Sequence, residues 1–117
     1  MTHLLADSEL EVTPSQTADA LAGETGQVID VREPYERDAG HIAATRHIEL
    51  ERLASEAETI DRERPVIFYC RAGSRSLMAA QAFRRAGYDA RSMAGGLTLW
   101  AAEGRPLVPE GGYVADH

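Results

Sequence analysis

The chain is organised around the segment Pro65-Val66-Ile67-Phe68-Tyr69-Cys70-Arg71-Ala72-Gly73-Ser74-Arg75-Ser76, an apolar run that opens into a short, arginine-flanked loop. Continuous apolar residues at 66–69 are typical of a parallel strand that is buried on both faces. Apolar residues at helical spacing follow, so we predict that Cys70 lies at the carboxyl end of a strand and faces the next helix. Backbone N–H groups converge there, and the helix dipole favours an anion. We therefore expect Cys70 to be held as a thiolate and to be the chemical centre of any function.

Strand and helix patterns alternate along the rest of the chain. We predict strands near 9–13, 28–31, 45–48, 66–69 and 88–93. Helices are expected over 14–23, 49–58, 76–86 and 97–103, with a short polar turn or helix beginning at 34. The alternation predicts an α/β fold with a mostly parallel central sheet and helices on both faces. Sites in such sheets form outside the carboxyl ends of the strands, which is where Cys70 is expected.

The length of 117 residues fits one domain. We expect an N-terminal extension at 1–8, the folded domain at 9–107 and a flexible C-terminal tail at 108–117. The tail contains Pro109 and the pair Gly111-Gly112, which are typical of loosely ordered chain.

Composition excludes several classes of function. The net charge of −7 argues against a nucleic-acid-binding surface, which needs clustered cations. The single cysteine excludes an internal disulfide. The first residues turn acidic too soon for a secretory signal, and no apolar stretch approaches the roughly 20 residues that span a bilayer. We therefore expect a cytoplasmic protein that does not bind membranes.

Four separated segments in this order resemble the single-domain rhodanese-like sulfurtransferase family over about residues 9–107. These are Ile29-Asp30-Val31-Arg32-Glu33-Pro34 leading to Gly40-His41-Ile42, the strand that ends in Cys70, the loop at 70–76, and Met93-Ala94-Gly95-Gly96-Leu97 with Trp100, Gly104 and Pro106. The family often has a Pro-Gly-Ala step after Gly-His-Ile, whereas Ala43-Ala44-Thr45 stands here. This departure affects a structural connection more than the chemistry. The resemblance implies a rhodanese-like fold and the transfer of a sulfane sulfur.

The resemblance implies a double displacement at Cys70. The thiolate attacks a small anionic donor such as thiosulfate and becomes a persulfide, which a thiol, cyanide or a protein acceptor then takes. No cofactor is implied. Because the chain has no second cysteine that could resolve the persulfide, the acceptor must come from outside the chain.

The loop is expected to bind the donor and the sulfur. Its residues are Arg71, Ala72, Gly73, Ser74, Arg75 and Ser76, whose backbone N–H groups can surround the Cys70 sulfur. Arg71 and Arg75 are predicted to guide the anionic donor, the alternative being two solvated surface arginines. Ser76 can cap the following helix and donate to the sulfur.

Three residues outside the loop are expected to support the site. Asp30 and Arg32 are interpreted as a scaffold that braces neighbouring loops, with Glu33 or Glu36 as possible partners. His41 could carry a proton, but a histidine in a turn between glycine and isoleucine more often bonds the backbone.

Other functions fit the sequence less well than sulfur transfer does. Phosphatases of this fold place five residues between the cysteine and an arginine, but four separate Cys70 from Arg75 and the next position is serine. A persulfide carrier without turnover, or a protein-interaction module, stays open as the alternative. A peroxide-sensing thiol ranks last because it needs an external resolving thiol. No metal site is predicted, since the histidines are scattered and there is no Cys-x-x-Cys; they are His3, His41, His47 and His117.

Overall fold

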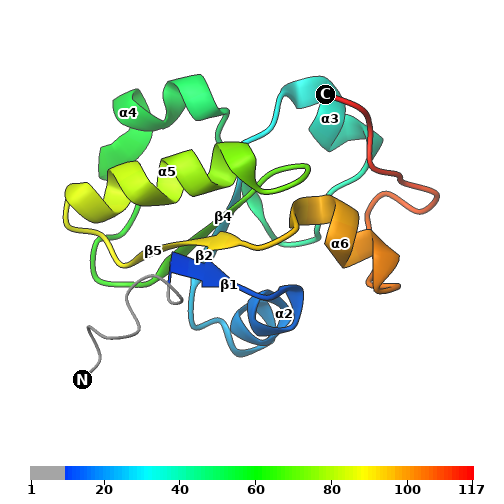
Figure 1. Cartoon of the computed structure of the whole chain (residues 1–117), viewed down its shortest axis with the longest axis horizontal. Coiled ribbons are helices and arrows are strands. Elements are labelled where there is room, and N and C mark those ends of the chain that lie inside the picture. The colour runs from blue at the N-terminus through cyan, green and yellow to red at the C-terminus, as the bar shows by residue number, and fades with distance from the viewer. Residues whose placement is uncertain (1–9) are drawn as a thin grey trace.

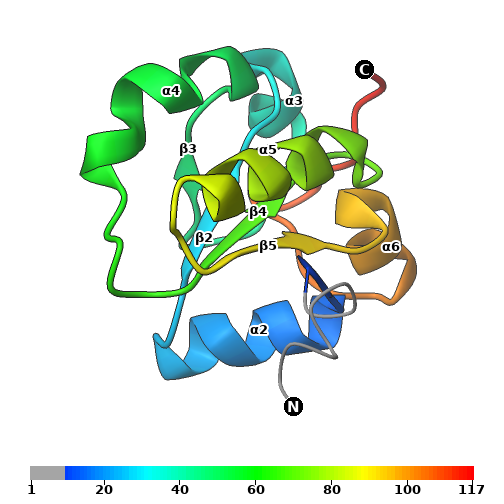
Figure 2. The ribbon, with the colours of Figure 1, turned by 60° about the vertical axis from the view of Figure 1, so that its left-hand side comes forward.

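The computed structural model describes residues 10–117, which contain a five-stranded sheet whose neighbouring strands are all parallel. The order across the sheet is β1-β5-β4-β2-β3. Figure 1 labels β1, β5, β4 and β2, and Figure 2 labels β3. The strands are β1 (Glu11–Val12), β2 (Gln27–Asp30), β3 (Arg46–His47), β4 (Val66–Tyr69) and β5 (Ala90–Met93). The predicted α/β fold with a mostly parallel sheet is confirmed, and β4 lies at the centre of that sheet. The extension expected at 1–8 lies outside the described residues.

Helices connect the strands in the described part of the chain. They are α2 (Pro14–Gly23), α3 (Pro34–Ala39), α4 (Leu53–Glu56), α5 (Ser74–Arg85) and α6 (Gly96–Ala102). The helix expected over 49–58 is instead three short pieces, because the 3₁₀ turns η2 (Leu50–Arg52) and η3 (Ala57–Thr59) flank α4. Leu50 and Leu53 are three residues apart, a spacing that a 3₁₀ turn can place on one face as well as an α-helix can.

Side chains of β4 alternate between two cores. Val66 and Phe68 pack in one core with Phe83 of α5, whereas Ile67 and Tyr69 belong to the other. Helices α4 and α5 cover the first face of the sheet, and α2 and α6 cover the second (Figures 1 and 2). Because side chains alternate with a period of two, the residue after Tyr69 continues on the α5 face. Strand parity therefore places Cys70 in the α5 core.

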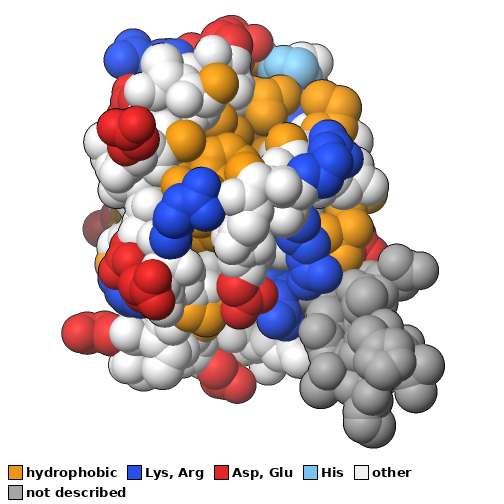
Figure 3. All heavy atoms as spheres, turned by 90° about the vertical axis from the view of Figure 1, so that its left-hand side faces the viewer, with side chains coloured by type: hydrophobic (Ala, Val, Ile, Leu, Met, Phe, Trp, Pro, Cys, Tyr) orange, Lys and Arg blue, Asp and Glu red, His pale blue; other side chains and the backbone are white. Residues whose placement is uncertain are grey.

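The surface carries both signs of charge. Figure 3 shows arginines and carboxylates interspersed around apolar patches on the face seen from the left-hand side of Figure 1. Among the helices of residues 10–117, none combines the length and apolar character that crossing a membrane requires.

Residues 108–117 lie against α3. Val108 forms a backbone bridge with His41, and the N–H of Tyr113 donates to the Ala39 carbonyl at 2.9 Å. A Cβ atom at Gly40 would come within 2.5 Å of the Tyr113 carbonyl oxygen, so only glycine permits this approach. These contacts hold the chain near Tyr113 at the C-terminal end of α3, and it then runs on to Asp116 and His117 beside the N-terminal end of that helix. The domain boundaries and the flexibility of this tail stay predictions.

Tyr69 ties the sheet to the segment between α3 and β3. Its ring is fully buried, and its hydroxyl accepts the Ile42 N–H at 3.1 Å and lies 3.2 Å from the Thr45 hydroxyl. Burial, with the charge of Asp30, raises the pKa of Tyr69 to about 12. The hydroxyl therefore stays neutral in the fold to a higher pH than in an unfolded chain.

This pKa predicts alkaline destabilisation through one residue. The chain has no lysine, so lysine titration does not contribute to this interval. An unfolded Tyr69 ionises near pH 10 and the folded one near 12. The free energy of unfolding should therefore fall across this interval, by up to about 1.4 kcal/mol per pH unit for this group. Urea unfolding at a series of pH values should give a shallower decline for Tyr69→Phe than for the original protein.

The matched control is Tyr113→Phe, at a tyrosine that is 63% exposed. That variant should keep the original slope. Equal slopes for Tyr69→Phe and the original protein would refute the assignment.

Candidate active site

Cys70 follows β4 directly and is held by the turn that leads into α5. Its sulfur accepts hydrogen bonds from the N–H of Gly73 at 3.1 Å and the N–H of Ser76 at 3.4 Å. The Ser76 hydroxyl lies 3.4 Å from the same sulfur. Gly73 has a φ of 112°, which a residue with a side chain rarely adopts, so glycine allows the turn to bring its own N–H onto the sulfur. Two backbone donors and one nearby hydroxyl therefore surround the sulfur of Cys70, a residue that is 1% exposed.

The start of α6 fixes the other side of the loop. The carbonyl of Cys70 accepts the Leu97 N–H at 2.8 Å, and the carbonyl of Arg71 accepts the Thr98 N–H at 3.0 Å. A Cβ atom at Gly96 would lie 2.5 Å from the Arg71 carbonyl oxygen, so the two backbones meet only because this residue is glycine. The hydrogen bonds to α6 fix the position of the loop. From that position the N–H groups of Gly73 and Ser76 donate to the sulfur.

Arg75 is held by Glu36. Its two terminal nitrogens each lie 2.9 Å from one carboxylate oxygen, and Glu36 is completely buried. Burial raises the pKa of Glu36, but the hydrogen bonds from Arg75 and from the Glu33 N–H outweigh it, so the pKa lies below its ordinary value. The hydrogen bonds to Glu36 raise the pKa of Arg75. Sequence reasoning offered Glu36 as a partner of Arg32, whereas the structure pairs it with Arg75.

Arg71 is the more exposed of the two loop arginines. Its side chain is 41% exposed, against 16% for Arg75. One terminal nitrogen lies 3.3 Å from a carboxylate oxygen of Asp116, whose backbone carbonyl accepts the Tyr35 hydroxyl at 3.2 Å. Residues 113–117 therefore reach the edge of the loop, a contact between distant segments that no local pattern indicated. The role of both arginines as anion guides stays a prediction.

Asp30 and Arg32 form a buried pair behind the site. Two nitrogens of Arg32 lie 2.9 Å from the Asp30 carboxylate, and one of them also donates to the Gly40 carbonyl at 2.8 Å. The His41 ring bonds the Arg37 carbonyl at 2.9 Å through Nδ1. These contacts join β2 to the turn after α3, and none of them involves Cys70.

The Ser76 hydroxyl has a further neighbour that sequence reasoning missed. Ser92 of β5 is fully buried and places its hydroxyl 2.8 Å from that of Ser76. A polar residue in the strand expected at 88–93, with the same parity as the buried Ala90, was the available signal.

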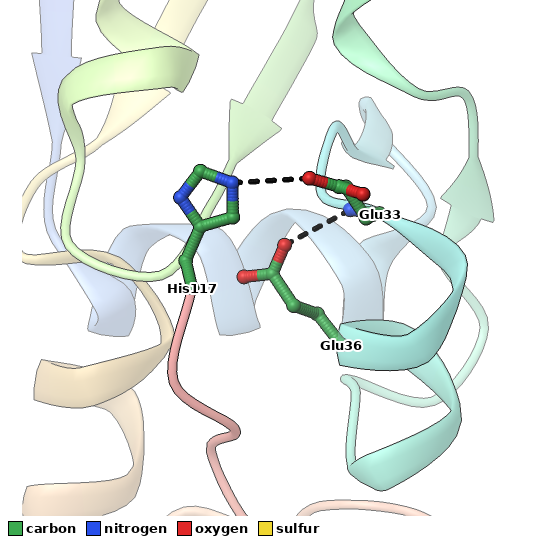
Figure 4. A group of neighbouring side chains, drawn as sticks. All are labelled: Glu33, Glu36 and His117. Atoms are coloured by element: carbon green, nitrogen blue, oxygen red, sulfur yellow. Dashed lines mark hydrogen bonds and ion pairs between the residues drawn. The ribbon is translucent and has the colours of Figure 1, made fainter.

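Glu33, Glu36 and His117 bring their ligand atoms within 4.8 Å of one another (Figure 4). His117 lies 3.2 Å from Glu33, while both oxygens of Glu36 bond Arg75. The cationic partner of Glu36 is thus a guanidinium, and we assign no metal to this cluster.

The chain is similar to known proteins of one family. A family model for the rhodanese-like domain matches residues 13–103. The chain is 33% identical over 97 residues to the thiosulfate sulfurtransferase GlpE of Pseudomonas aeruginosa, covering 82% of this chain and 87% of that protein. It is 38% identical over 78 residues to the uncharacterized protein YqhL of Bacillus subtilis, covering 66% of this chain and 62% of that protein. A crystal structure of a rhodanese-related protein from Thermoplasma volcanium superimposes with a TM-score of 0.78 at 26% identity, covering 84% of this chain and 96% of that one.

The pair of Arg75 and Glu36 predicts a large stability difference between the loop arginines. Arg75→Ala leaves the Glu36 carboxylate buried without its partner and should lower the free energy of unfolding by about 3 kcal/mol. Arg71→Ala removes an exposed pair and should cost less than about 1 kcal/mol. Urea unfolding of both variants at neutral pH measures the difference.

A second change tests the cause. Glu36→Gln in the Arg75→Ala background removes the buried charge and should restore part of the loss. Because the pKa of Glu36 is lowered in the fold, the deficit of Arg75→Ala should shrink as the pH falls below 4.5, where an unfolded glutamate becomes protonated. A deficit that is equal for Arg71→Ala and Arg75→Ala would contradict the prediction.

Proposed function

Because the chain belongs to the rhodanese-like domain family, we propose that it is a sulfurtransferase that carries the transferred sulfur as a persulfide on Cys70. Relatives named as sulfurtransferases support sulfur transfer in general. The observation that carries the proposal is the convergence of the Gly73 and Ser76 N–H groups on the sulfur of Cys70. Fixed donors of this kind stabilise negative charge on sulfur without reorganising during a reaction.

In the first step the Cys70 thiolate attacks the outer sulfur of a donor such as thiosulfate. A new S–S bond forms, the S–S bond of the donor breaks, and sulfite leaves with the electron pair. Thiosulfate is proposed as the donor because a relative of 33% identity carries that name and because Arg71 offers an exposed cation at the loop. The step needs the thiolate, which the loop donors favour.

In the second step a nucleophile, such as cyanide or a thiolate, attacks the outer sulfur of the persulfide. The bond from that sulfur to Cys70 breaks, and its electron pair returns to Cys70 as a thiolate. The donors from Gly73 and Ser76 are already in place for this charge, so they assist the departure of Cys70. The acceptor comes from outside the chain, since Cys70 is its single cysteine.

Persulfide formation predicts a defined mass change. Incubation with thiosulfate should add one sulfur atom to the intact protein, and cyanide should remove it with release of thiocyanate. Intact-protein mass spectrometry follows both steps. Cys70→Ser should gain no mass, and a gain in that variant would overturn the assignment. If the protein is a persulfide carrier without turnover, it should load sulfur on Cys70 but produce no steady thiocyanate. A turnover assay therefore separates the carrier from the enzyme.

We predict that substitutions of Arg71 and of its partner Asp116 change the KM for an anionic donor in opposite directions. Arg71→Ala removes the exposed cation and should raise the KM for thiosulfate, whereas Asp116→Asn releases Arg71 from a competing carboxylate and should lower it. Each effect should be up to about fivefold, the range expected for one exposed ion pair. Steady-state kinetics measures both variants.

Arg52→Ala is the matched control, because it removes an arginine of an exposed ion pair next to α4. It should leave the KM unchanged. Unchanged KM values for Arg71→Ala and Asp116→Asn would mean that Arg71 is a solvated surface arginine with no role in binding the donor.

A further inference from the structure

Two buried hydroxyls stand in line behind the sulfur of Cys70. The Ser76 hydroxyl lies 3.4 Å from that sulfur and 2.8 Å from the Ser92 hydroxyl. It also lies 3.2 Å from the Gly73 carbonyl oxygen, to which it can donate. Ser76 and Ser92 are both fully buried, and they come from α5 and β5 respectively.

The hydrogens of the two hydroxyls can be assigned from their neighbours. Among the hydrogen bonds of the described residues, the Ser92 hydroxyl has one partner, the Ser76 hydroxyl. If Ser76 donated to Ser92, the hydrogen of Ser92 would be buried without an acceptor, which is costly. Ser92 therefore donates to Ser76. The single hydrogen of Ser76 is then left for the Gly73 carbonyl or for the Cys70 sulfur.

We propose that Ser92 is a positioning residue, which keeps the Ser76 hydroxyl available as a donor to the Cys70 sulfur. When Cys70 is a neutral thiol, Ser76 donates to Gly73 and can accept the thiol hydrogen. When Cys70 is a thiolate, the hydrogen of Ser76 turns from the Gly73 carbonyl to the sulfur. No proton is transferred between the serines; one hydroxyl rotates while Ser92 continues to donate to it. The relevance of this arrangement to sulfur transfer rests on the proposed function.

Polarisation gives Ser92 its influence on the sulfur. A hydroxyl that accepts one hydrogen bond becomes a better donor in the next, by about 10–30% per bond. The Ser92 hydroxyl also fixes the Ser76 oxygen in a buried position from which its hydrogen can reach the sulfur. Ser92→Ala should consequently weaken the donor without removing it, whereas Ser76→Ala removes it.

Charged groups near the loop also influence the sulfur, and the test leaves them in place. Arg71 comes from the loop and Arg75 from α5, and each already has a carboxylate partner: Asp116 for Arg71, and Glu36 of α3 for Arg75. The buried pair of Asp30 and Arg32 lies at the end of β2. None of these groups bonds the Ser92 hydroxyl. A change caused by Ser92→Ala is thus assigned to the hydroxyl pair.

The experiment follows the thiolate of Cys70 by its ultraviolet absorbance across a pH series, with Cys70→Ser as the blank. It uses the full chain without any donor, so it does not depend on sulfur transfer. Ser92→Ala should lower the thiolate-to-thiol ratio at a given pH by about threefold. Ser76→Ala should lower it by about tenfold or more. Ser92→Thr, which keeps a hydroxyl, should restore most of the ratio.

The double variant gives the decisive comparison. If Ser92 acts through Ser76, then Ser92→Ala should have no further effect once Ser76→Ala is present. Additive effects in the double variant, or an unchanged ratio in Ser92→Ala, would overturn the inference.

Thr17→Val is the stability control, because it deletes a fully buried hydroxyl that bonds the Thr13 carbonyl of α2. Thr17→Val should leave the thiolate-to-thiol ratio of Cys70 unchanged, however much it lowers the stability of the protein. If the original protein forms the persulfide but Ser92→Ala leaves the thiolate-to-thiol ratio unchanged, the role of Ser92 is refuted and the proposed function is not. Absence of persulfide in the original protein would refute the proposed function and leave the hydroxyl pair to be judged by the absorbance.

Discussion

The close approach of the Cys70 loop to the first turn of α6 is the constraint on which the site depends. Two loop carbonyls, of Cys70 and Arg71, accept N–H groups from α6, and Gly96 leaves the space for them to meet. Their engagement fixes the direction of the chain at the end of β4. The next residues turn back at Gly73, which directs the N–H groups of Gly73 and Ser76 onto the sulfur. The segment at 70–76 therefore accepts hydrogen bonds from α6 through its carbonyls and donates hydrogen bonds to the sulfur through its N–H groups.

The sequence predicts the parts of this arrangement that depend on neighbouring residues. The apolar run at 66–69 indicates a buried strand, and strand parity together with the helical pattern after the loop places Cys70 between β4 and α5. Thr13 and Gln16 form a capping box at the start of α2, which depends on neighbouring residues in the same way. Such features depend on the residue order within one or two turns of the chain.

Features that join distant segments could not be predicted in this way. Arg75 and Glu36 are 39 residues apart, and both lie in patterns that also suit a solvated surface. Ser92 differs from an ordinary small residue in a strand only because β5 lies beside β4 and under α5. Asp116 reaches Arg71 because Gly40 lets residues near 113 lie close to the end of α3. Each contact is set by packing between elements rather than by local spacing.

The pairing of charges bears on the proposed transfer, in which the sulfur of Cys70 changes between two forms. The charge of Arg75 is matched by Glu36, so this pair adds no net charge next to Cys70. The hydrogen bonds that the sulfur accepts then come from two backbone N–H groups, and the Ser76 hydroxyl lies beside it. A dipole stabilises the thiolate without forming an ion pair that must break when the sulfur is substituted. Under the proposed transfer, the loop would keep one geometry for the thiolate and for the persulfide, and the role proposed for Arg71 at its edge is to meet the anionic donor.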